Sequence, residues 1–185
     1  MEVKLSEGAF DNCGPLLNAE KLADLKTLPQ WECDEVASQC QLAIRDALEK
    51  HGELLHTDAT EPQTKFFIVN PVLSALGYVF SVNESISVTG DTSAAVDYTL
   101  FDASEGFEEA LPFRGGQAFF RGAIALCQAT GWEDSLDLHE DAEVAAQQPI
   151  VVLDVLLRST GVDYGIATNG RTWRLVNRGS SETYG

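Results

Sequence analysis

Two acidic residues and a group of arginines are the positions where this sequence could do chemistry. Asp97 lies in a segment of alternating apolar residues, and Glu61 begins a segment with helical spacing. Carboxylate oxygens suit a hard cation such as Mg²⁺, so Asp97 and Glu61 could hold a metal ion. Arg171, Arg174 and Arg178, grouped around a predicted hairpin, could contact phosphate groups. A site for a cation and a phosphate is therefore one interpretation of these residues.

Each of these residues also has a plainer structural interpretation. Asp97 could be a solvated strand residue, and Glu61 a first-turn carboxylate that interacts favourably with the helix dipole. The arginines could be solvated charges on an edge strand. Trp132 and Trp173 fit the role of core anchors better than that of stacking platforms for bases. The residue types alone leave both interpretations open.

Three segments have the apolar spacing of helices. The first runs from Asp34 to a breaker at His51-Gly52, and the second runs from Glu61 to Leu76. Pro71 lies inside the second segment and should kink it, because proline lacks a backbone N–H. Residues 146–160 form the third segment, where Val151 and Val152 also allow a strand. A further apolar patch, residues 16–28, predicts a helix, so we expect an N-terminal helical arm over residues 1–52 and the main domain over 53–185.

Between and after these helices the apolar period changes to two, which predicts strands over residues 79–88, 95–101, 122–129, 164–168 and 172–176. In the second strand, alternation places Val96, Tyr98 and Leu100 on one face and Asp97 on the other. Asn169-Gly170 predicts a tight hairpin between the last two strands. The acidic, glycine-containing stretch 102–117 predicts an inserted loop, and residues 131–145 predict another.

This order of elements, helix, three strands, helix and closing strands, resembles the PD-(D/E)XK nuclease fold. Residues 60–78 look like the opening helix of restriction-enzyme nuclease domains, and Val96-Asp97-Tyr98 stands where such domains carry a Pro-Asp-Tyr or similar triplet. Residues 161–175 resemble their closing hairpin even more closely. The resemblance is to the N-terminal nuclease region of type IIG restriction–modification enzymes and covers residues 15–185. It implies a restriction-endonuclease-like, three-layer α/β domain with a central mixed sheet flanked by helices.

The same resemblance implies a degenerate active site. In the family an Asp and a Glu from adjacent strands bind Mg²⁺, and a Lys two residues after the Glu assists the attacking water. Here Asp97 matches the Asp, whereas Gln128 stands at the Glu position and Thr130 at the Lys position. A neutral amide is a poor replacement for a carboxylate at a hard cation, and a hydroxyl supplies no positive charge. We therefore expect no bound cofactor, with Mg²⁺ required only if activity has survived.

Composition limits the remaining possibilities. The chain has 185 residues, 44% of them hydrophobic, which fits one globular domain and is too apolar for intrinsic disorder. Its 12 Lys and Arg against 29 Asp and Glu give a net charge of −17, which disfavours DNA binding in dilute salt. Molar salt would screen that repulsion, and the five lysines fit a halophilic protein. No apolar run predicts a membrane span or signal peptide, so we expect a cytoplasmic protein. The cysteines lack the spacing of a zinc site; they are Cys13, Cys33, Cys40 and Cys127.

The sequence thus predicts an inactive restriction-endonuclease-like domain that could retain binding of DNA or of a restriction–modification protein. Two alternatives stay open. One is an active Mg²⁺-dependent endonuclease whose catalytic groups have moved, for example to Glu133 or Asp134. The other is an acidic interaction protein without enzymatic activity, such as an inhibitor that imitates the charge of DNA.

Overall fold

The computed structural model describes residues 24, 27–29, 34–55, 59–89, 92–137, 141, 143 and 146–179. Most of the helix expected over residues 16–28 lies outside these ranges, as do the turn at 90–91, Cys13 and Cys33. Contacts divide the chain into Met1–Asp34 and Glu35–Gly185, and the fold described below is that of the second unit. The expected domain boundary after residue 52 stays a prediction.

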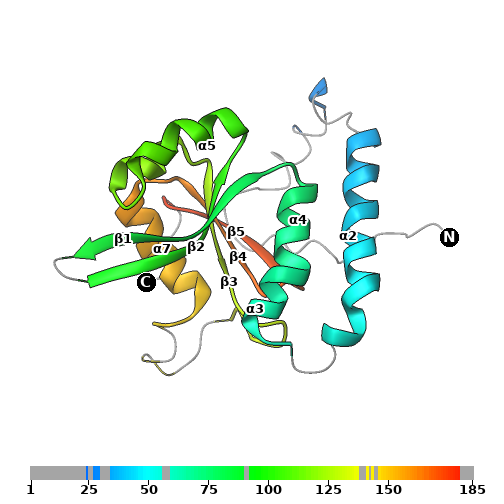
Figure 1. The fold of residues 1–185 in the computed structure, drawn as a ribbon. Helices are drawn as coiled ribbons and strands as arrows, with labels where there is room; N and C mark the ends of the chain where they lie inside the picture. The colour runs from blue at the N-terminus through cyan, green and yellow to red at the C-terminus, as the bar shows by residue number, and fades with distance from the viewer. Residues whose placement is uncertain are drawn as a thin grey trace. The chain divides into compact units, whose positions relative to one another are not determined.

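A five-stranded mixed sheet forms the centre of this unit (Figure 1). The strands lie in chain order, with β3 and β4 parallel and every other neighbouring pair antiparallel. A parallel pair needs a crossover, and the helix α7 (Pro149–Thr160) provides it. The strands are β1 (Val79–Thr89), β2 (Thr92–Phe101), β3 (Ala125–Ala129), β4 (Tyr164–Thr168) and β5 (Trp173–Asn177).

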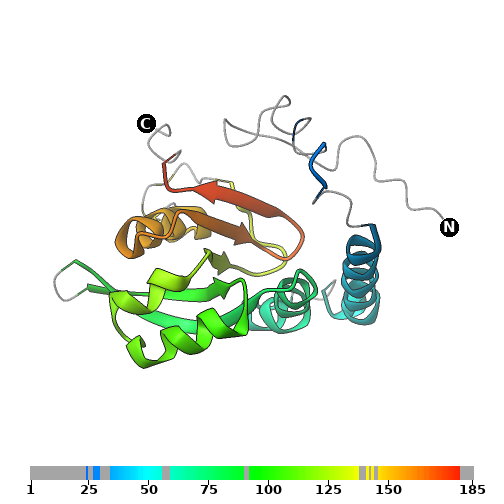
Figure 2. The same ribbon diagram turned by 90° about the horizontal axis from the view of Figure 1, so that it is seen from above.

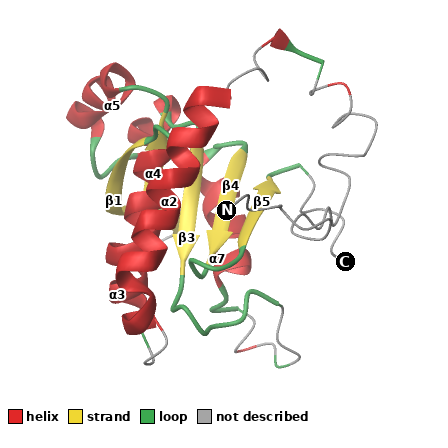
Figure 3. Cartoon of the chain, turned by 90° about the vertical axis from the view of Figure 1, so that its right-hand side faces the viewer, coloured by secondary structure: helices red, strands yellow, loops and turns green. Residues whose placement is uncertain are grey.

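Helices cover both faces of the sheet, which confirms the expected α/β class. One face carries a continuous helical run built from α3 (Glu61–Thr64), the π-helical turn η2 (Lys65–Val69) and α4 (Asn70–Ala75). The other face carries α5 (Ser104–Ala110) and α7, as the view from above shows (Figure 2). The long helix α2 (Asp34–Leu55) packs on the outer side of α4 (Figure 3).

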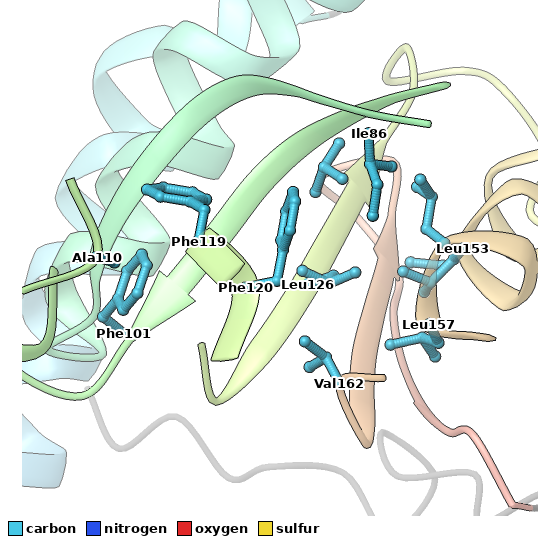
Figure 4. Packing of buried hydrophobic residues seen from close by; sticks show 12 residues of the cluster. Ile86, Phe101, Ala110, Phe119, Phe120, Leu126, Leu153, Leu157 and Val162 are labelled. Atoms are coloured by element: carbon cyan, nitrogen blue, oxygen red, sulfur yellow. The ribbon is translucent and has the colours of Figure 1, made fainter. Parts of the chain in front are cut away.

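Each face of the sheet has its own apolar core. On the α7 side, side chains from β1, β2, β3 and α7 converge with the 3₁₀ turn η4 (Gln117–Gly122); Figure 4 shows Phe119, Leu126 and Leu153 among them. On the α4 side, Val69 and Leu73 pack against apolar side chains of β2 and β3. Burial on both faces explains why β3 reads as a continuous apolar strand in the sequence.

The opening helical run contains the distortion that Pro71 predicts. Because Pro71 has no N–H, it cannot make the regular α-helical bond to the turn before it. The preceding residue, Asn70, donates its N–H to the carbonyl of Lys65, five residues back, so the chain forms one wide π turn. At the start of the run, Gln63 Oε1 accepts the Thr60 N–H at 2.9 Å, which caps the helix. The π turn begins at Lys65, a residue that belongs to the candidate site.

Two local expectations are wrong. The stretch 102–117 is mainly helical, with α5 followed by the 3₁₀ turn η3 (Leu111–Phe113), because Phe107 packs on Phe101 with ring centroids 5.4 Å apart. In addition, α2 does not stop at His51-Gly52. It continues to Leu55, which is 2% exposed, so burial of this side chain outweighs the glycine.

A third expectation fails within β2. Val96 packs in the core on the α7 side, whereas Tyr98 and Leu100 pack on the α4 side, so these three residues do not share a face. The pairing of β1 with β2 places Val82 opposite Tyr98 and Glu84 opposite Val96. Between these two pairs, Asn83 of β1 has a positive φ of 55°. The alternation of side chains in β2 is interrupted at this level, between Val96 and Tyr98.

Among the described residues, no helix is both long enough and apolar enough to cross a bilayer.

Candidate functional site at the fork between β2 and β3

Asp97 lies where β2 and β3 separate, a place that we call the β2–β3 fork. The strand pairing runs from Leu100 opposite Ala125 to Tyr98 opposite Cys127. Beyond Tyr98, side chains replace the main-chain ladder. The Asp97 N–H donates to Gln128 Oε1 at 3.2 Å, and the Ala129 N–H donates to Asp97 Oδ2 at 2.8 Å. Each strand therefore supplies a side-chain acceptor for a main-chain N–H of the other strand.

The second carboxylate oxygen of Asp97 contacts a lysine from the opening helical run. Lys65 Nζ lies 2.6 Å from Asp97 Oδ1 and 2.5 Å from Glu61 Oε1. Glu61 and Lys65 are four residues apart, a spacing that places both side chains on one side of a helix. The Lys65 side chain is 19% exposed and that of Asp97 is 11% exposed, so this pair is largely removed from water.

Electrostatics keep the lysine charged. Burial by itself would lower the pKa of Lys65, but the hydrogen bonds to Asp97 and Glu61 outweigh it and raise the pKa above its ordinary value of 10.5. The neighbouring Cys127 is buried, and burial together with the Asp97 charge raises the pKa of its thiol. Cys127 therefore stays protonated and is a poor nucleophile. Burial likewise raises the pKa of Tyr98, which remains neutral.

The structure brings together only part of the sequence-predicted site. Asp97 and Gln128 are in contact, and Glu61 joins them through Lys65. Thr130 instead donates its hydroxyl to Asp134 Oδ2 at 2.5 Å, and the Gly131 N–H donates to the same oxygen. Asp134 thus closes the turn after β3.

The arginines proposed as phosphate contacts pair with acidic side chains of this chain. Arg171 lies 3.1 Å from Glu133, and Arg174 contacts Asp137 and donates to the carbonyl of Leu136. Arg178 likewise pairs with a nearby carboxylate, Asp163. Arg171 and Arg174 thus contact the segment after β3 from the β4–β5 hairpin.

Trp132 occupies the core-anchor position that the sequence favoured. Its backbone N–H donates to the hydroxyl of Thr64 at 3.0 Å, and the guanidinium of Arg171 lies 5.7 Å from its ring centroid. It packs in the small cluster under α2 together with Ile68. The loop after β3 therefore contacts both the opening helix and the closing hairpin through Trp132.

Lys65 is the one member of this site that sequence reasoning missed. Its signal was present in part, because Glu61 and Lys65 form an i, i+4 pair of opposite charge on a predicted helix. The contact to Asp97 joins residues on a helix and a strand, and no periodicity in the sequence predicts it.

The side chains at the fork do not fit Mg²⁺. Only two carboxylates approach each other, and a lysine ammonium lies between them. Elsewhere in the part of the chain that the structure describes, no three His, Cys, Asp or Glu side chains are grouped as metal ligands. A hard divalent cation requires several oxygen ligands and is repelled by a fixed positive charge.

A groove of about 480 Å³ lies between α2, α4 and the β4–β5 hairpin. Apart from the paired Arg171 and Arg174, its side-chain lining is apolar, with Leu48, Leu76 and Leu175 among the residues. Its lining contains no acidic or nucleophilic side chain.

Fold and site together define an α/β protein with an open five-stranded sheet and a Lys–Asp–Glu cluster at a strand fork. Comparisons with family models, curated proteins and solved structures matched nothing to this chain.

Proposed function

We propose that this chain is a restriction-endonuclease-like domain that has lost cleavage activity and acts by binding. The order of helices and strands, and the closing hairpin at Asn169-Gly170, support the restriction-endonuclease-like assignment. The observation that carries the loss of activity is that the Gln128 amide oxygen and the Asp97 carboxylate both accept backbone N–H groups at the fork, from Asp97 and Ala129 respectively.

Metal-assisted phosphodiester hydrolysis needs ligands with free oxygens and a positive charge near the attacking water. At the fork, Gln128 Oε1 is used by the Asp97 N–H, and Asp97 Oδ2 is used by the Ala129 N–H. The Thr130 hydroxyl is used by Asp134. The polar atoms at the first two family positions therefore connect β2 and β3, and the third position closes the turn after β3.

A protein partner fits this binding role better than DNA does. The arginines expected to contact DNA, Arg171 and Arg174, are paired with Glu133 and Asp137. The net charge of −17 also repels a polyanion, except where molar salt shortens the Debye length to about 3 Å. An acidic protein favours a basic partner surface.

Incubation of the full chain with supercoiled plasmid and Mg²⁺ or Mn²⁺, at low and molar KCl, tests the proposal. We expect no more nicking than Asp97→Asn gives after identical purification, and gel-shift titration should show weaker DNA binding at low salt than at molar salt. Metal-dependent nicking that Asp97→Asn abolishes would overturn the loss of activity.

One observation favours a second candidate, an active nuclease with a relocated lysine. Lys65 Nζ lies beside Asp97, where a positive charge could act on an attacking water. The other relocated groups considered, Glu133 and Asp134, are engaged with Arg171 and in the turn after β3. This candidate requires the plasmid assay to show nicking that both Asp97→Asn and Lys65→Met abolish.

A further inference from the structure

We infer that Lys65 is a built-in counter-ion that takes the place of a bound cation between the opening helix and the β2–β3 fork. This inference rests on the proposed loss of cleavage and explains how the acidic pair persists without a metal ion.

The geometry at Lys65 is that of a cation with two carboxylate ligands. Its ammonium lies 2.5 Å from Glu61 Oε1 and 2.6 Å from Asp97 Oδ1. These distances are close to the roughly 2.3–2.6 Å at which Ca²⁺ binds oxygen. The ammonium therefore bridges two carboxylates, the buried one of Asp97 and the half-exposed one of Glu61.

Because Asp97 is buried, its negative charge needs a positive charge close by. Asp97 is 11% exposed on its side chain, so water screens its charge poorly. Its other oxygen is fixed by the Ala129 N–H at 2.8 Å, and the carboxylate cannot turn away without losing that bond. A positive charge at the Lys65 position therefore stabilises both the acid and the connection between α3 and β2.

A tethered ammonium differs from a metal ion in one measurable respect. Its local concentration is fixed by the chain, so the fold should be indifferent to chelators and to divalent cations at this site. Removing the ammonium leaves the fixed Asp97 carboxylate with Glu61 on the neighbouring helical turn, and we expect this pair then to bind a divalent cation. Ca²⁺ is the best probe, because it tolerates variable coordination geometry and has no redox chemistry.

The test compares the wild-type chain with Lys65→Ala in EDTA and in excess CaCl₂. Lys50→Ala is the matched control, because Lys50 is an exposed lysine of α2. Circular dichroism melting and calorimetric Ca²⁺ titration are the readouts, and neither depends on DNA or on cleavage. The wild-type chain and Lys50→Ala measure the Ca²⁺ background of the acidic surface.

We expect Lys65→Ala to melt earlier than wild type in EDTA and to recover in Ca²⁺, while the other two chains show only the background response. Ca²⁺ should bind Lys65→Ala at least about tenfold more tightly than wild type, and adding Glu61→Gln should remove most of that gain. If Lys65→Ala folds poorly, Lys65→Gln replaces it in the test, because glutamine is closer to lysine in length. Ca²⁺-dependent folding of either variant supports the inference. Variants that are folded but indifferent to Ca²⁺, or unfolded with and without it, would overturn it. Plasmid nicking by the wild-type chain would instead contradict the proposed function, so the two failures are distinguishable.

Discussion

Asp97 donates its backbone N–H to the side chain of Gln128 across the point where β2 and β3 separate. The amide oxygen of Gln128 accepts the Asp97 N–H, and the Asp97 carboxylate accepts the N–H of Ala129, the residue after Gln128. These two bonds continue the connection between the strands after the regular pairing ends at Tyr98 and Cys127. The side chains of Asp97 and Gln128 therefore help to hold β2 and β3 together.

Replacing Gln128 with Ala should destabilise the fold by about 1–2 kcal/mol, because it leaves the backbone N–H of the buried Asp97 without its acceptor. Urea unfolding followed by circular dichroism measures this difference. Gln39→Ala, on the exposed surface of α2, is the control and should stay within about 0.5 kcal/mol of wild type. Equal stability of Gln128→Ala and wild type would mean that water replaces this bond without cost.

Two glycines should respond to alanine in opposite directions. Gly170 has a φ of +84°, and a Cβ there would lie 3.1 Å from Thr64 and from Trp132, so Gly170→Ala should cost at least about 1 kcal/mol. Gly52 lies within α2 with no atom within 4 Å of an added Cβ, and Gly52→Ala should stabilise by about 0.5–1 kcal/mol. Urea unfolding of both variants tests the pair. A stabilising Gly170→Ala would contradict the hairpin geometry.

The contribution of Lys65 should decline at high pH. Its pKa in the folded chain is raised above 10.5, so the folded state holds this proton more tightly than the unfolded state does. The stabilisation is therefore fully present below pH 10.5 and declines as pH rises through the folded-state value. The difference in unfolding free energy between wild type and Lys65→Gln should be constant near neutral pH and shrink above about pH 10.5. A difference that disappears near neutral pH would contradict this assignment.

Salt should stabilise the fold. A net charge of −17 repels itself over a Debye length of about 10 Å at 0.1 M salt, and about 3 Å at 1 M. The melting temperature should therefore rise as KCl increases across that range. A melting temperature that is independent of KCl, or lowered by it, would argue against adaptation to high salt and would leave a basic partner as the explanation of the acidity.

Local sequence signals predicted the elements with a strong period or a specific turn. Alternating apolar residues predicted β1, β4 and β5, and Asn169-Gly170 predicted their closing hairpin, because the positive φ at Gly170 is a local requirement. Pro71 likewise predicted a distortion in the opening helix through its missing N–H. These features depend on residues close together in the chain.

Packing between distant residues decided what the local signals could not. The acidic stretch around Phe107 is helical because that ring packs on Phe101. Val96 packs on the α7 side next to the part of β1 where Asn83 has a positive φ. The arginines expected at DNA pair with carboxylates that only the folded chain brings near them. The sequence by itself thus determined the α/β class and the positions of Asp97 and Gln128. Only the tertiary structure determined that Lys65 lies between Glu61 and Asp97, because that contact depends on how a helix packs against a strand fork.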